Sequence, residues 1–248
     1  LIVGKRFSTA ALGFYTRASN FPIAFSDVAV NAISSVALVS FSDSQDNIEV
    51  GRSRLKHYVQ YSYMLISPLM IGLACVSPAF ITVLLTEKWI SCVPYLIIFS
   101  IGYLFQPLCA IYGQAVSGIG RSDLYLRVFY IIKPICILLI ILSVTLFDSP
   151  IYIAIVILIS QILESFVQGL NVKKLFNLSY LEQFKIWWPS IRNGIIMGIF
   201  VVLVSFIPLG VFMKLILQIF TGMAVYSLIT YITNRKLIKE LIHSLKNS

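Results

Sequence analysis

Apolar residues along the chain come in runs of about 20, separated by short polar connectors, and a run of that length forms a helix that crosses the hydrocarbon core of a bilayer. This pattern predicts an all-α, polytopic transmembrane helix bundle. Its apolar windows place seven spans near residues 9–41, 58–86, 91–117, 124–147, 150–172, 190–208 and 211–233.

Prolines punctuate this pattern in two ways. Those inside the predicted spans indicate kinked helices, because neighbouring helices in a membrane bundle can satisfy the carbonyls that a proline leaves unpaired. They are Pro22, Pro68, Pro78, Pro107 and Pro134. Pro150 and Pro189, in contrast, stand where a helix is expected to begin.

Composition agrees with membrane insertion, since 58% of residues are hydrophobic and 12% charged, against about 25% charged in soluble domains. The net charge of +9 could suggest a nucleic-acid partner, but the basic residues lie mostly in connectors, so we expect none. Alternate connectors carry twelve Lys and Arg on one side and four on the other. The positive-inside rule therefore predicts a multi-pass membrane protein with a cytoplasmic C-terminus.

Polar residues recur at intervals of three and four in three predicted spans, which gives each helix a polar stripe that is unsuited to lipid. The first stripe is Arg17, Asn20, Ala24, Asp27, Asn31 and Ser34. The second is Tyr103, Gln106, Ala110, Gln114 and Ser117. The third is Gln161, Glu164, Ser165, Gln168 and Asn171.

Two charged residues of consecutive spans lie at matching depths. Lys133 is about 10 residues from one end of its span and Glu164 about 8 from the same end of the next, which predicts an ion pair. Arg17 and Arg127 are then the less compensated cations. The stripes have two readings: either they are polar contacts that pack helices together, or they line a hydrated cavity for an anionic, polar substrate.

The sequence contains few of the residue groupings that catalysis requires. Its two histidines, His57 and His243, lie at predicted span edges, the acidic residues are scattered, and neither HExxH nor GxSxG occurs. The glycine-containing segment at 117–123 has the wrong spacing for a phosphate loop and indicates a tight turn. We expect no catalytic residue, no metal site and no cofactor, while a coupling ion, H⁺ or Na⁺, stays open.

Several segments resemble the C-terminal half of bacterial polysaccharide exporters of the Wzx flippase type (WzxC-like), in the multidrug/oligosaccharidyl-lipid/polysaccharide (MOP) exporter superfamily. They are LIVGKRF and AALGFYTRA within 1–18, SPLMIGLA at 67–74, LLTEKW at 84–89 and VSGIGRSDLYLR at 116–127. The resemblance implies a fold of up to 14 helices in two lobes, with this chain supplying helices 8 to 14. It lacks an N-terminal lobe on that view, and its first residues read as the end of a truncated helix.

The implied layout has four parts: a preceding helix end at 1–8, a second-lobe transport bundle at 9–175, two peripheral transmembrane helices at 176–234 and a cytoplasmic basic tail at 235–248. The resemblance further implies translocation of an undecaprenyl-pyrophosphate-linked oligosaccharide across the bacterial inner (cytoplasmic) membrane by alternating access for surface polysaccharide biosynthesis. Membrane lipids and polysaccharide polymerase machinery are the other expected partners.

Candidate cavity residues follow from the stripes and, for Arg17, from its place in the LGFYTRA segment. They are Arg17, Asp27, Asn31, Gln106, Arg127, Lys133, Gln161, Glu164 and Gln168. Two alternatives to a flippase fragment stay open: an ion-coupled, MATE-like exporter of small molecules that uses Asp27 or Glu164, and a membrane scaffold without transport activity, in which the stripes only pack helices.

Overall fold

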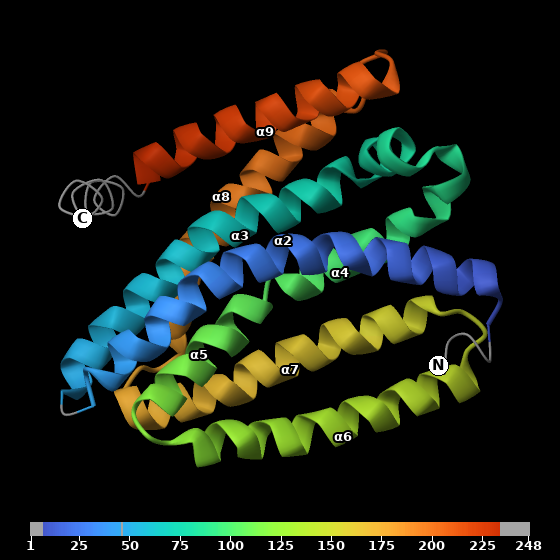
Figure 1. Ribbon diagram of the computed structural model, residues 1–248. Coiled ribbons are helices and arrows are strands. Elements are labelled where there is room, and N and C mark those ends of the chain that lie inside the picture. Colours follow the sequence, from blue (N-terminus) through green and yellow to red (C-terminus); the bar gives the residue numbers. More distant parts are fainter. Residues whose placement is uncertain (1–6, 46, 234–248) are drawn as a thin grey trace.

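The computed structural model describes residues 7–45 and 47–233, and these form an all-α bundle (Figure 1). The predictions for the helix end at 1–8, apart from its last two residues, and for the basic tail at 235–248 lie outside the described residues. The elements in chain order are α2 (Thr9–Ser42), α3 (Ile48–Leu85), the short 3₁₀ helix η1 (Glu87–Cys92), α4 (Val93–Tyr103), α5 (Gln106–Gly118), α6 (Ser122–Leu146), α7 (Ile151–Phe176), α8 (Tyr180–Val204) and α9 (Val211–Thr233).

Within the described residues, six helical segments are long and apolar enough to cross a membrane, and they correspond to six of the seven predicted spans. The remaining predicted span, at 9–41, forms the long helix α2. With 34 residues α2 is about 51 Å long, more than a hydrocarbon core of about 30 Å requires. The helix begins where the Ser8 side chain accepts a hydrogen bond from the Ala11 N–H. It carries the polar residues of the first stripe, Arg17, Asn20, Asp27 and Asn31 among them.

The span predicted at 91–117 is broken. Helix α4 ends at Tyr103 and α5 begins at Gln106, with Pro107 in its first turn. Proline has no N–H for the Tyr103 carbonyl, which favours a break at this point. The buried Tyr63 hydroxyl of α3 donates a 2.7 Å hydrogen bond to the Leu104 carbonyl within the break. Another helix therefore satisfies a carbonyl that lipid could not.

Most of the described basic connector residues gather at one end of the bundle, with Lys88 and Lys214 at the other, which agrees with the predicted alternation of the spans. Figure 1 shows the α2–α3, α5–α6 and α7–α8 connections at the same end, which we call the basic end. It holds Arg52, Arg54, Lys56, Arg121, Arg127, Lys173, Lys174 and Lys185. The predicted tight turn between α5 and α6 is also present, and Gly120 adopts a φ of +80° there, a conformation that favours glycine.

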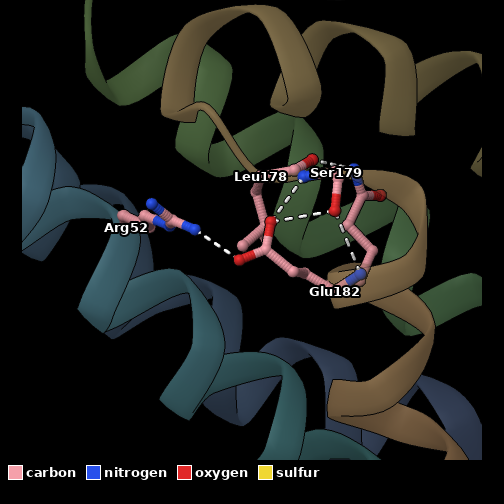
Figure 2. Close-up of polar contacts among 5 residues, drawn as sticks. Arg52, Leu178, Ser179 and Glu182 are labelled. Atoms are coloured by element: carbon pink, nitrogen blue, oxygen red, sulfur yellow. Dashed lines mark hydrogen bonds and ion pairs between the residues drawn. The ribbon is translucent and has the colours of Figure 1, made fainter.

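Helix α8 begins at Tyr180, and the prediction that Pro189 starts this helix is wrong. Ser179 and Glu182 form a capping box, in which each side chain bonds the backbone N–H of the other residue. Figure 2 shows the Glu182 carboxylate also accepting a hydrogen bond from Arg52 of α3, at 2.5 Å. This cap starts the helix ahead of Pro189, which then lies inside it.

Helix α3 is the common support of two groups of helices. It packs against α8 and α9 on one side and against α2, α4 and α5 on the other, while α7 packs against α4, α5 and α6. The largest buried cluster lies toward the basic end and includes Phe41, Leu55, Tyr63, Tyr112 and Phe176. This packing fixes α2, α5 and α7 relative to one another, and these three helices carry the polar stripes.

Candidate functional site

Four of the predicted site residues lie deep in the bundle at similar depths. Asp27 is 15 residues from the end of α2 and Gln106 is 12 from the end of α5, which places them about 22 and 18 Å from the basic end. Lys133 is 11 residues into α6 and Glu164 is 12 from the end of α7, which corresponds to about 16 and 18 Å. All four therefore lie near the middle of a bilayer that the bundle spans.

Asp27 and Gln106 meet at the broken helix. The Gln106 side chain lies in the first turn of α5, where its Nε2 donates to Asp27 Oδ1 at 3.4 Å. Its Oε1 accepts a hydrogen bond from the buried Ser26 hydroxyl. One amide thus bridges two neighbouring residues of α2, and we call Ser26, Asp27 and Gln106 the α2–α5 contact.

Lys133 and Glu164 form the predicted ion pair, which is confirmed with an Nζ to Oε2 distance of 2.7 Å. The Lys133 side chain is 42% exposed and that of Glu164 is 13% exposed, so the cation has the better access to the surroundings. The ammonium also lies 5.2 Å from the ring centroid of Phe129. The arrangement neutralises a midspan carboxylate and leaves part of the ammonium accessible.

The polar stripe of α2 is largely uncovered by the described part of the chain. Arg17, Asn20, Ala24 and Asn31 are exposed and Asp27 is half-buried, all along one face of the helix. Arg127, near the start of α6, is exposed as well. The structure does not bring Arg17, Asn31 and Arg127 into the two midspan contacts.

The α7 stripe divides along its length. The backbone carbonyl of Gln161 accepts a hydrogen bond from the Cys109 thiol, at 3.8 Å, and its buried side-chain Oε1 has no partner among the described residues. Gln168 is 1% exposed and accepts a hydrogen bond from Asn171, which also donates to the Leu124 carbonyl at the start of α6. The C-terminal part of the stripe, with Gln168 and Asn171, therefore packs α7 against α6.

Sequence reasoning missed Ser26 and Tyr63. Ser26 lies beside the α2 stripe rather than on it, and only its position next to Asp27 could have indicated it. Nothing in the sequence indicated the role of Tyr63, because its hydrogen bond depends on the residue at which the break between α4 and α5 falls. Three grooves with volumes of 380, 650 and 480 Å³ lie elsewhere, and within the described residues none of the nine predicted site residues lines them.

The sequence of the chain is similar to those of proteins from polysaccharide biosynthesis. Residues 1–94 match the family model described as "Polysaccharide biosynthesis protein". Over 125 residues the chain is 30% identical to the teichuronic acid biosynthesis protein TuaB of Bacillus subtilis (strain 168), an alignment that covers 50% of this chain and 26% of TuaB.

A solved structure covers nearly the whole chain. The lipid II flippase MurJ, in an inward closed conformation, matches with a TM-score of 0.77 and 20% sequence identity over 92% of this chain and 48% of MurJ. At this identity the likeness concerns the fold. The chain spans less than half the length of either relative that it matches.

The helices and their apolar surfaces define a multi-pass membrane protein with a flippase fold. The predicted resemblance to proteins of polysaccharide biosynthesis is confirmed by the family model and by TuaB, and the predicted flippase-type fold is confirmed by MurJ.

Proposed function

We propose that the chain forms one lobe of a flippase that moves an undecaprenyl-pyrophosphate-linked oligosaccharide across the bacterial inner membrane by alternating access. In this proposal it is not an enzyme, its C-terminus is cytoplasmic, and the transported glycan goes to surface polysaccharide. Polymerase machinery acts after it. The family match at residues 1–94 and the flippase fold support the class of transporter.

The uncovered stripe of α2 is the observation that carries the proposal. Exposed Arg17 and Asn31, with half-buried Asp27 between them, run through the depth of a bilayer. A charged side chain at the centre of a membrane helix costs about 2.5–3.5 kcal/mol on insertion scales, so this face requires water or further protein. A hydrated cavity, completed by another lobe of the transporter, meets that requirement.

The cations give the cavity its chemistry. Arg17 and the accessible part of Lys133 would attract a pyrophosphate, whose charges otherwise make it costly to move through a medium of low dielectric constant. Amides such as Gln106 and Asn31 would form hydrogen bonds with sugar hydroxyls. The pairing of Lys133 with Glu164 prevents the cation from binding an anion too tightly to release it.

Export of surface glycan tests this proposal. In cells that depend on the protein, we expect Arg17→Ala and Lys133→Ala to reduce surface glycan at least about tenfold, which corresponds to about 1.4 kcal/mol of lost stabilisation. Lys133→Arg should retain export, because it keeps the charge. Lys214→Gln, on α9 at the opposite end of the bundle, is the matched control. Normal glycan in Arg17→Ala and Lys133→Ala cells with unchanged protein abundance would refute these roles.

The packing of Gln168 and Asn171 favours the scaffold alternative for one part of the α7 stripe. A scaffold needs no hydrated face on α2, however, and the exposed residues of that helix set the two functions apart. If proton or sodium coupling exists, Glu164 and Asp27 are the candidates to carry it.

A further inference from the structure

Helices α7 and α8 share a connection at the basic end and then separate (Figure 1). They separate because α7 packs against α4, α5 and α6, whereas α8 packs against α3 and α9. The floor of the resulting wedge is formed by Phe105, Leu108 and Tyr112. The groove has a volume of 380 Å³, within the range of roughly 300–1,000 Å³ that is typical of ligand sites.

The walls of this α7–α8 groove are apolar and aromatic. Ile162 and Phe166 line it from α7, and Leu181 and Phe184 line it from α8. Its polar wall residues use hydrogen bonds within the protein. Ser165 donates to the Ile162 carbonyl, Tyr180 donates to the Phe166 carbonyl, and the Gln183 Nε2 donates to two carbonyls. A ligand of this groove is therefore a hydrocarbon chain rather than a sugar.

The length of the groove matches one leaflet of a bilayer. Ile162, at its inner end, is 11 residues before Lys173, a separation of about 16 Å along the helix. Half of a hydrocarbon core of about 30 Å is nearly the same distance. A single acyl chain of a lipid in the leaflet at the basic end would fill this length.

The mouth of the groove is cationic. Lys173 and Lys174 lie in the last turn of α7, and the Lys173 Nζ is 6.0 Å from the ring centroid of Tyr180, a wall residue. Lys185 directly follows the wall residue Phe184 and is exposed. The carboxylate of Glu182, in the first turn of α8, accepts hydrogen bonds from the Arg52 guanidinium and from the Ser179 N–H (Figure 2). The charges at the mouth thus favour an anionic head group.

We propose that the α7–α8 groove binds an anionic glycerophospholipid, with one acyl chain between α7 and α8 and its phosphate at Lys173, Lys174 and Lys185. A polyprenyl carrier is longer than one leaflet and fits this length poorly. The site is distinct from the α2 stripe and does not depend on the proposed transport function. Its occupant would stabilise the separation of α8 from α7.

Quenching of tryptophan fluorescence tests this site directly. The chain has three tryptophans, so Trp89→Phe with Trp188→Phe leaves Trp187, which lines the groove. This variant is placed in phosphatidylcholine nanodiscs that contain increasing fractions of phosphatidylglycerol with brominated acyl chains. We expect half-maximal quenching at a mole fraction at least about fivefold lower than with brominated phosphatidylcholine, since one lysine near an anionic head group contributes about that factor.

The lysines supply the controls. In the same background, Lys173→Gln, Lys174→Gln and Lys185→Gln together should abolish the preference for phosphatidylglycerol, whereas Lys214→Gln at the opposite end should keep it. An unchanged emission maximum of Trp187 shows that the variants fold. The proposal is overturned by equal quenching with the two lipids, by a preference that survives the triple substitution, or by undecaprenyl phosphate displacing the brominated lipid better than phosphatidylglycerol does.

Discussion

The Lys133–Glu164 pair joins two residues that hydrocarbon would penalise separately. Removing one partner leaves the other charge deep in the bundle without compensation, and that costs more than the pair itself contributes. The 42% exposure of the Lys133 side chain moderates this cost, because an accessible ammonium can find water. The consequences for the two residues should therefore differ.

Glu164→Gln and Lys133→Gln should each lower the free energy of unfolding, with the larger loss for Lys133→Gln, since this leaves the more enclosed carboxylate unpaired. We expect about 1.5–3 kcal/mol for Lys133→Gln, the range for hydrogen bonds to charged groups. Titration with SDS in mixed micelles measures it. The double variant should lose less than the sum of the two single variants, and additive losses would contradict the coupling.

Tyr63 offers a second test at the same scale. Tyr63→Phe removes the donor to the Leu104 carbonyl and should cost about 1–3 kcal/mol, as for a buried acceptor left unpaired. Pro107→Ala supplies an N–H to the Tyr103 carbonyl and not to that of Leu104, so adding it to Tyr63→Phe should not replace the lost bond. The same SDS titration measures both, and no change in Tyr63→Phe would mean that the carbonyl finds another donor.

Among single residues, the sequence predicted contacts that depend on depth and missed those that depend on backbone geometry. Lys133 and Glu164 could be paired because helical rise fixes the depth of each in its span. The bond from Tyr63 to Leu104 could not, since a proline indicates a weak point but not the residue at which a helix stops. For stripe residues without a described contact, it remains a prediction that they face a hydrated cavity.

Helix α8 shows how a local signal at the scale of elements can be overlooked. The sequence S-Y-L-E at 179–182 has the spacing of a capping box, but hydropathy placed the span further along, at Pro189. Hydropathy detects the part of a helix within lipid and not its polar first turns. For the same reason α3 begins at Ile48, ahead of the span predicted from residue 58.

The two interactions at the start of α8 should contribute unequally. Ser179→Ala removes the helix cap and should cost about 1 kcal/mol of stability, the usual value for such a substitution. Arg52→Gln breaks a partly exposed ion pair and should cost less, roughly 0.2–1 kcal/mol. Hydrogen exchange of the amides of residues 180–184 measures both. Ser53→Ala, an exposed serine of α3, is the control, and faster exchange in Arg52→Gln than in Ser179→Ala would reverse the predicted order.

On the scale of the whole molecule, alternating connectors and charge predicted the arrangement of the bundle well. Most of the basic connector residues that the structure describes share one end, and α3 divides the helices into two groups (Figure 1). The break in α4–α5 brings Gln106 to Asp27, and the α6–α7 contact brings Lys133 to Glu164. A polar face on α2 remains, and the proposed transport function depends on its being hydrated.

Accessibility of cysteines to a membrane-impermeant maleimide measures this hydration in intact membranes. The four native cysteines are first replaced by serine or alanine, and single cysteines are then placed at Ala24 and Asn31, on either side of Asp27. Ile195, an exposed residue of α8 that lies 15 residues from the start of its helix as Asp27 does from the end of α2, is the control matched for depth. We predict rapid labelling of Ala24→Cys and Asn31→Cys and almost none of Ile195→Cys. Labelling of the two α2 positions as slow as that of Ile195→Cys would contradict a hydrated face and favour helices that only pack.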